Sequence, residues 1–139
     1  MRLSSKGRYA VMAMAELAKR NRGKPVPLTE ISLRQGISIL YLVPLFLKLK
    51  KQKLVNSTRG PLGGYVLTKS PDQIKLSYII SAVEEEVKTI KCDKHSKKGC
   101  NGKSFKCITH NLWDELGNHI NLFFERKSVK DVINFQNDL

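Results

Sequence analysis

The sequence predicts a mainly α fold with a small β-hairpin wing: a winged helix-turn-helix domain followed by a long C-terminal helix. Three observations support this fold class. Two helical segments flank a glycine turn at residues 35–36, two short strand segments follow them directly, and an amphipathic segment covers residues 109–126. A chain of 139 residues has room for one compact domain with such a helical arm.

The first helix is predicted over residues 6–20, where Ser4 and Ser5 precede it as capping residues and Gly23 and Pro25 follow it. Its apolar residues at helical spacing predict one buried face, formed by Val11, Met14, Ala15 and Ala18. A fourth helix is predicted over residues 76–86, where Ile79, Ile80 and Val83 suit packing against the preceding elements.

The second and third helices, over residues 29–34 and from Ser38 to near Lys51, have the order of a helix-turn-helix. Apolar residues stand where two crossing helices must pack: Ile31, Ile37, Leu42 and Leu45. An ordinary helical hairpin is the alternative. Pro44 lies well inside the third helix and lacks the N–H that would bond the Leu40 carbonyl, so we expect a kink or a late helix start.

Strand segments at residues 54–55 and 65–67, joined by NSTRGPLGG, favour the helix-turn-helix because a hairpin at this place is a wing. Arg59 is predicted at the tip of the wing, where it can enter a narrow minor groove. Ser38 and Tyr41 lie at the start of the third helix, the end that faces base edges. The far end of this helix carries Lys48, Lys50 and Lys51. These lysines either contact phosphates or form a solvated face.

The net charge of +13 is unevenly distributed along the chain. Residues 1–87 carry +9, residues 88–108 carry +6 and residues 109–139 carry −2. Such a basic chain favours a nucleic-acid partner.

The longest uncharged apolar stretch, residues 39–47, is too short to span a membrane, and the first residues lack a secretory pattern. Three cysteines, an odd number, favour a reducing compartment, so we expect the cytoplasm.

The three cysteines and a histidine fall close together in the sequence: Cys92, Cys100, Cys107 and His110. Three thiolates and one imidazole can complete a four-ligand site for zinc or an iron–sulfur cluster, with His95 as a further candidate. The neighbouring lysines favour the thiolate form that binds metal. Unrelated cysteines buried as small apolar residues are the alternative. The wide intervals between the cysteines lean away from zinc.

The last helix, over residues 109–126, carries an apolar stripe formed by Leu112, Trp113, Leu116, Ile120, Phe123 and Phe124. A small chain cannot easily cover a face so rich in aromatic residues, which predicts a homodimer; packing against the first helix is the alternative. The expected organisation is a DNA-binding domain at 1–87, a cluster-binding loop at 88–108, a dimerisation helix at 109–127 and a flexible tail at 128–139.

The motifs MRLSSKGRYAV, ISLRQGIS, RGPLGGY, IISAVEE and KCITHNLWDEL together resemble the winged-helix family of IscR-type iron–sulfur cluster regulators. The resemblance implies a dimeric bacterial transcription factor that binds double-stranded operator DNA and represses the genes that build iron–sulfur clusters. It implies a [2Fe–2S] cluster held by Cys92, Cys100, Cys107 and His110. It also implies DNA contacts from Ser38, Tyr41, Ser57, Arg59, Gly60 and Pro61.

The sequence departs from that family at two places. Seven and then six residues separate the cysteines where the family has five, and Val43 and Pro44 replace a Glu-Gln pair of the recognition helix. Operator preference is therefore expected to differ. An exposed cluster is readily lost, so a purified protein is expected to occur also in an apo form.

Three alternatives stay open. The same site can serve a winged-helix regulator that senses nitric oxide, redox state or zinc. Metal can also merely hold the loop of a structural nucleic-acid-binding protein. A redox enzyme is disfavoured because no Cys-x-x-Cys pair or catalytic constellation is present. We therefore predict a protein that is not an enzyme and has no small-molecule substrate.

Overall fold

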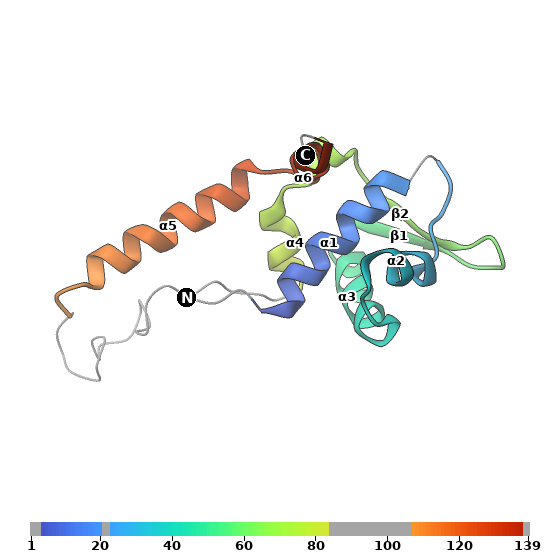
Figure 1. Ribbon diagram of the computed structural model, residues 1–139, viewed down its shortest axis with the longest axis horizontal. Helices are drawn as coiled ribbons and strands as arrows, with labels where there is room; N and C mark the ends of the chain where they lie inside the picture. The colour runs from blue at the N-terminus through green and yellow to red at the C-terminus, as the bar shows by residue number, and fades with distance from the viewer. Residues whose placement is uncertain (1–3, 21–22, 84–106, 138–139) are drawn as a thin grey trace.

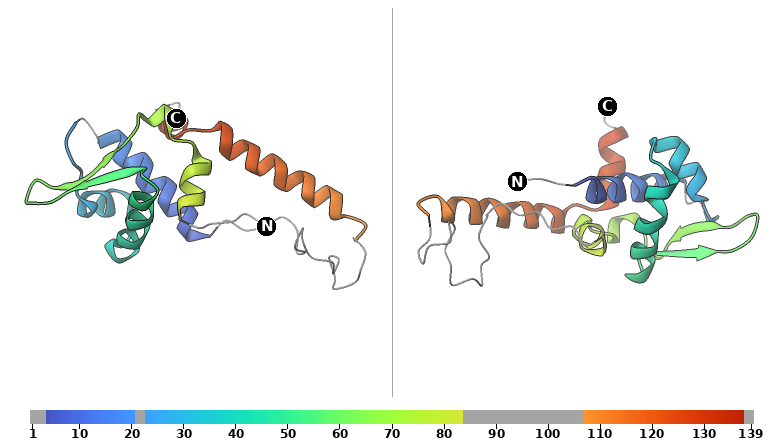
Figure 2. Two further views of the ribbon diagram at one scale, coloured as in Figure 1. Left: turned by 180° about the vertical axis from the view of Figure 1, so that it is seen from behind. Right: turned by 90° about the horizontal axis from the view of Figure 1, so that it is seen from below.

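The computed structural model describes residues 4–20, 23–83 and 107–137. Its elements, in chain order, are α1 (Ser5–Arg20), α2 (Leu28–Gln35), α3 (Ile39–Lys51), β1 (Val55–Thr58), β2 (Gly64–Leu67), the short 3-10 helix η1 (Pro71–Gln73), α4 (Leu76–Ala82), α5 (His110–Arg126) and α6 (Val129–Asn137). Helix α5 and the β1–β2 hairpin project from opposite ends of the molecule (Figures 1 and 2). Within these ranges no helix is long and apolar enough to cross a membrane.

Helix α1 lies at the centre of the core and packs against α2, α3, α4 and α6. Its fully buried face consists of Ala10, Ala13, Met14 and Leu17. The predicted face is therefore correct only at Met14, since Val11, Ala15 and Ala18 are half-buried. Ala10 and Ala13 belong to the buried face instead, and their small side chains allow the neighbouring helices to approach the α1 backbone closely.

Helices α2 and α3 form the predicted helix-turn-helix. Gly36 ends α2 in the left-handed conformation, with a φ of 65°, which glycine adopts without a steric penalty. The Ser32 hydroxyl donates to the Ile37 carbonyl across the turn. The four residues predicted to pack between the helices are all buried: Ile31, Ile37, Leu42 and Leu45.

Helix α3 starts directly after Ser38 and continues through Pro44 without a break. The Ser38 side chain accepts a hydrogen bond from the Leu40 N–H at 3.3 Å, which fixes the start of the helix. The predicted late start at Pro44 is wrong. The missing hydrogen bond is that of the Leu40 carbonyl, which loses its helical donor at the proline; Leu40 itself is 83% exposed.

A buried carboxylate fixes α1 relative to α2, although sequence reasoning did not identify it. Glu16 is 4% exposed and accepts hydrogen bonds from Arg20 Nε at 3.1 Å and Gln35 Nε2 at 2.9 Å. Arg34 Nε lies 3.9 Å from the same carboxylate. A buried charge is costly unless it is paired, so these contacts make the packing of α1 against α2 specific.

The flexible tail predicted from residue 128 is wrong, because residues 129–137 form α6, which packs on α1. Two backbone hydrogen bonds of 2.9 Å hold its start, from the Leu76 N–H to the Lys127 carbonyl and from the Val129 N–H to the Ile74 carbonyl. Val129 is 1% exposed, and Val132 and Ile133 pack against the core. Helix α4 begins at Leu76 as predicted, while residues 84–86 lie outside the described residues.

Helix α6 begins with a reciprocal cap between Ser128 and Asp131. Asp131 Oδ2 accepts from the Ser128 N–H at 2.9 Å and from its hydroxyl at 3.1 Å, and Ser128 Oγ lies 3.3 Å from the Asp131 N–H. The hydrogen bond from the Ser128 backbone is the main reason why the pKa of Asp131 lies below its ordinary value of 3.8.

We expect Asp131→Ala to lower the Tm by a few degrees at neutral pH. The folded-state pKa is the lower one, so the cap stabilises fully above the unfolded pKa and is lost as the pH falls through the folded pKa. The Tm difference from wild type should therefore shrink below about pH 4. Thermal unfolding followed by circular dichroism at several pH values measures it, with Asp72→Ala as the control. An equal difference at all pH values would contradict the prediction.

Candidate nucleic-acid interface

The start of α3 carries the two candidate base-contacting residues, Ser38 and Tyr41. Tyr41 is 45% exposed, and its hydroxyl lies 3.1 Å from Ser5 Oγ at the first residue of α1. Its ring meets Tyr9 edge-on, with centroids 5.3 Å apart. Tyr41 therefore joins the recognition helix to α1, a contact across 36 residues that no local sequence pattern could indicate.

The wing is an antiparallel pair with Ser57 opposite Tyr65 and Thr58 opposite Gly64. Tyr65 fixes this hairpin to the rest of the domain. It exchanges backbone hydrogen bonds of 2.9 and 2.8 Å with Val26, and its ring lies 4.8 Å from that of Phe46 on α3. The wing thus has a set position relative to the recognition helix.

Gly64 makes the pairing with Val26 possible. Its φ is 152°, and a Cβ atom at this place would overlap the Val26 carbonyl group and lie 2.6 Å from the Pro27 nitrogen. We expect Gly64→Ala to destabilise the protein by about 2 kcal/mol or more and to weaken operator binding by displacing the wing. Chemical denaturation and a gel-shift titration measure the two effects.

Gly23→Ala is the matched control, because Gly23 also has a positive φ, of 81°, but a Cβ atom added there would meet no atom within 4 Å. It should cost less stability and leave operator binding intact. Equal losses in both variants would show that backbone conformation, rather than the approach to Val26, explains the effect.

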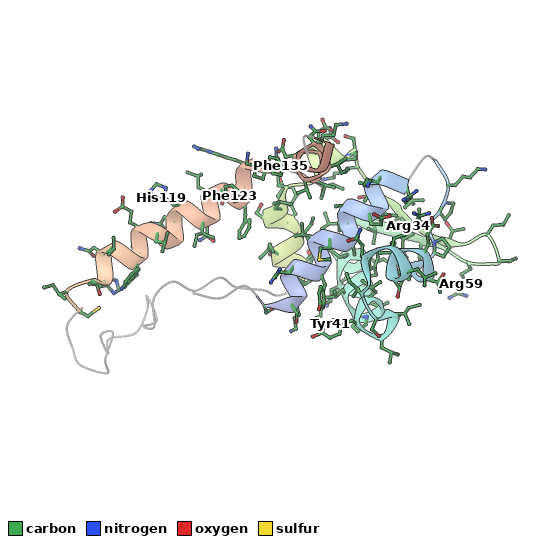
Figure 3. All side chains as sticks on the ribbon, viewed as in Figure 1. Arg34, Tyr41, Arg59, His119, Phe123 and Phe135 are labelled. Carbon is green, nitrogen blue, oxygen red and sulfur yellow. The ribbon has the colours of Figure 1, made fainter. Side chains whose placement is uncertain are left out.

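The proposed wing contacts lie next to the recognition helix. Lys50 Nζ on α3 donates to Ser57 Oγ at 2.6 Å, and Arg59, Gly60 and Pro61 are exposed in the turn that follows β1. Figure 3 shows Tyr41 on α3 and Arg59 on the projecting hairpin. The structure therefore places all six candidate DNA-contacting residues on two neighbouring elements of one motif.

Two of the four candidate metal ligands share a single turn at the start of α5. The His110 N–H donates to the Cys107 carbonyl at 3.1 Å; His110 is 8% exposed and Cys107 is half-buried. Cys92, His95 and Cys100 lie outside the described residues. In the part of the chain that the structure describes, no group of three or more His, Cys, Asp or Glu side chains forms a metal site.

Helix α5 exposes half of the residues of its apolar stripe. Leu112, Trp113 and Phe123 are 55%, 40% and 51% exposed, while Leu116, Ile120 and Phe124 are half-buried. His110 is the one buried residue of this helix among those described. The helix extends away from the core helices and packs on α4 near the body of the molecule (Figure 1).

A helix-turn-helix followed directly by a hairpin wing defines the winged helix-turn-helix class of DNA-binding proteins. A family model described as "Rrf2: Iron-dependent Transcriptional regulator" matches residues 3–135. The chain belongs to this Rrf2 family.

Relatives of known name agree with this assignment. The HTH-type transcriptional regulator IscR of Aliivibrio salmonicida is 49% identical over 133 residues, which cover 96% of this chain and 77% of the relative. IscR of Yersinia pseudotuberculosis is 45% identical over 139 residues, covering 100% and 83% of the two chains.

Solved structures show the same fold. T. potens IscR matches with a TM-score of 0.76 and 33% identity, covering 98% of this chain and 88% of its own. CymR, the global cysteine regulator of B. subtilis, matches with a TM-score of 0.80 and 27% identity, covering 97% of this chain and 98% of its own.

The predicted fold class and the resemblance to IscR-type regulators are confirmed. The named relatives are transcriptional regulators and not enzymes, so this chain is an IscR-type, DNA-binding regulator of transcription.

Proposed function

We propose that the protein is a homodimeric repressor of iron–sulfur cluster biogenesis genes that acts in the cytoplasm and senses cluster status through a [2Fe–2S] cluster. Cys92, Cys100, Cys107 and His110 hold the cluster in this proposal. The observation that carries it is the placement of Cys107 and His110 on one turn at the start of the exposed helix α5.

The donor chemistry of this turn fits an iron–sulfur cluster. A thiolate and an imidazole are both accepted ligands of [2Fe–2S] centres, and the two residues are joined by the 3.1 Å hydrogen bond between their backbones. Cys92 and Cys100 complete the set of four. When bound, the cluster supplies a cross-link that forms only while iron and sulfide are available.

Hydrogen bonds connect this turn to the apolar stripe of α5. Trp113 Nε1 donates to Thr109 Oγ1 at 3.0 Å, and Cys107 Sγ lies 3.8 Å from the same hydroxyl. Cys107 and His110 therefore flank a residue that positions Trp113 on the stripe. Ligation that orders this turn also orders the first turn of the proposed dimerisation helix, which couples the sensor to the assembly that binds DNA.

The exposed stripe supports the homodimer. A second copy related by a two-fold axis would cover Leu112, Trp113 and Phe123 with the same residues of its own α5. Such a dimer presents two recognition helices and two wings to a palindromic operator. Ser38 and Tyr41 would then face base edges, and Ser57, Arg59, Gly60 and Pro61 would follow the adjacent backbone and minor groove.

The test is purification without oxygen, followed by a visible spectrum and by iron, sulfide and zinc analysis. We expect red-brown protein with about two irons and two sulfides per chain. Colourless protein with stoichiometric zinc would instead favour zinc or thiol sensing. That second function is a specific alternative because three thiolates and one imidazole can also hold zinc.

A further inference from the structure

The recognition helix α3 is apolar on its exposed side as well as on its buried side. Leu40, Val43 and Leu47 are 83%, 43% and 58% exposed and recur at the spacing of one helical face. The opposite face is buried and consists of Leu42, Leu45, Phe46 and Leu49. A surface helix normally presents polar residues to water, so an exposed stripe of this kind indicates a contact surface.

Hydrogen-bonding side chains are scarce on this part of α3. Between residues 38 and 47 only Ser38 and Tyr41 have them. Ser38 Oγ already accepts the Leu40 N–H, and the Tyr41 hydroxyl is already bonded to Ser5 Oγ. The side-chain hydrogen bonds that α3 can offer to base edges are therefore few, and apolar contact has to contribute most of the direct readout.

The charge around the exposed apolar face of α3 indicates which kind of partner binds it. Lys50, Lys51, Lys53 and Arg59 are exposed at the end of α3 and on the wing, which suits a polyanion rather than an apolar protein partner. The apolar group that a base pair presents in the major groove is the C5-methyl group of thymine.

We propose that Leu40, Val43 and Leu47 form a specificity surface that packs on thymine methyl groups in each operator half-site. This inference rests on the proposed function, in which α3 enters the major groove. Leu40 and Val43 lie in the N-terminal part of the helix, where base edges are met first. Leu47 lies one turn further along the same face.

The experiment starts from a library of random-sequence duplexes, from which the full-length protein selects its preferred sites. The enriched duplexes are then prepared with thymine or with uracil, which lacks only the C5-methyl group, and titrated side by side. We expect enriched half-sites to contain thymines, and we expect uracil to weaken binding about fourfold for each contacted thymine. Unselected random duplexes should bind equally well in both forms.

Two variants test whether this surface of α3 causes the weaker binding of uracil duplexes. Leu40→Ala and Val43→Ala should move the ratio of thymine to uracil affinities towards one. Leu33→Ala is the matched control, because Leu33 is 85% exposed but lies on α2, and it should leave the ratio unchanged. Circular dichroism establishes that all three variants fold.

Each other outcome overturns the inference in a recognisable way. Enriched sites that bind equally with thymine and uracil would overturn it and leave a sequence-specific regulator standing. An unchanged ratio in Leu40→Ala and Val43→Ala, together with altered self-association, would assign the stripe to a protein contact. A library that yields no preferred sequence would contradict specific DNA binding as well. Iron and sulfide content, measured on the same preparation, tests the cluster independently.

Discussion

Replacing Leu112 and Phe123 together by aspartate should convert the protein from dimers to monomers and weaken operator binding about 100-fold or more. Both side chains are at least half exposed on the apolar stripe of α5, where a second copy would cover them. Four carboxylates buried in one two-fold interface would each lose hydration without a partner. A monomer would then contact one half-site at a time and lose the gain that comes from simultaneous binding.

Sedimentation velocity and a gel-shift titration on a palindromic site measure these two effects. Leu122→Asp is the matched control, because Leu122 is 40% exposed on the same helix but lies outside the stripe. It should remain dimeric and bind normally. Dimers that persist in the double variant would show that another surface joins the two copies.

The second large effect is expected at the ligand turn. Cys107→Ala should abolish the cluster, with iron and sulfide near zero after purification without oxygen, because three remaining ligands hold a [2Fe–2S] centre poorly. We expect operator affinity or selectivity to change at least tenfold, within the usual range of coupling between two sites. The visible spectrum and titrations on two or more selected operators measure both quantities.

Two histidines of α5 provide the matched comparison for that experiment. His110 is buried at the first residue of the helix, whereas His119 lies on the exposed side, with Nε2 3.7 Å from Glu115. His110→Ala should lose the cluster as Cys107→Ala does, and His119→Ala should retain it. A variant that loses the cluster but binds every operator as the wild type does would refute coupling between the cluster and DNA affinity.

The helix-turn-helix and its wing could be predicted because local chemistry marks their boundaries. Ser38 is a capping residue, Gly36 adopts the left-handed turn, and the glycines around Pro61 mark a turn between two strands. The candidate ligands Cys107 and His110 could be found for the same reason, since a spacing of three residues places them on one turn.

Contacts between distant parts of the chain could not be predicted. Glu16 meets Gln35 across 19 residues, and Tyr41 meets Ser5 across 36. Helix α6 was not predicted from the sequence. Its apolar face is short, formed by Val129, Val132 and Ile133, and it is stabilised by packing against α1. The late start expected at Pro44 fails because the cap at Ser38 fixes the start of the helix, which continues through the proline despite one missing hydrogen bond.

The opposite positions of α5 and the wing bear on how such a regulator can diverge over evolution. The turn with Cys107 and His110 stands away from the core helices, and both longer cysteine intervals fall between Cys92 and that turn (Figure 1). The sequence between Cys92 and that turn contains no residue of α1–α4, so insertions there change none of these helices. Lineages can therefore change the spacing of the proposed cluster ligands and the side chains of α3 separately, and acquire new signals and new operators by independent steps.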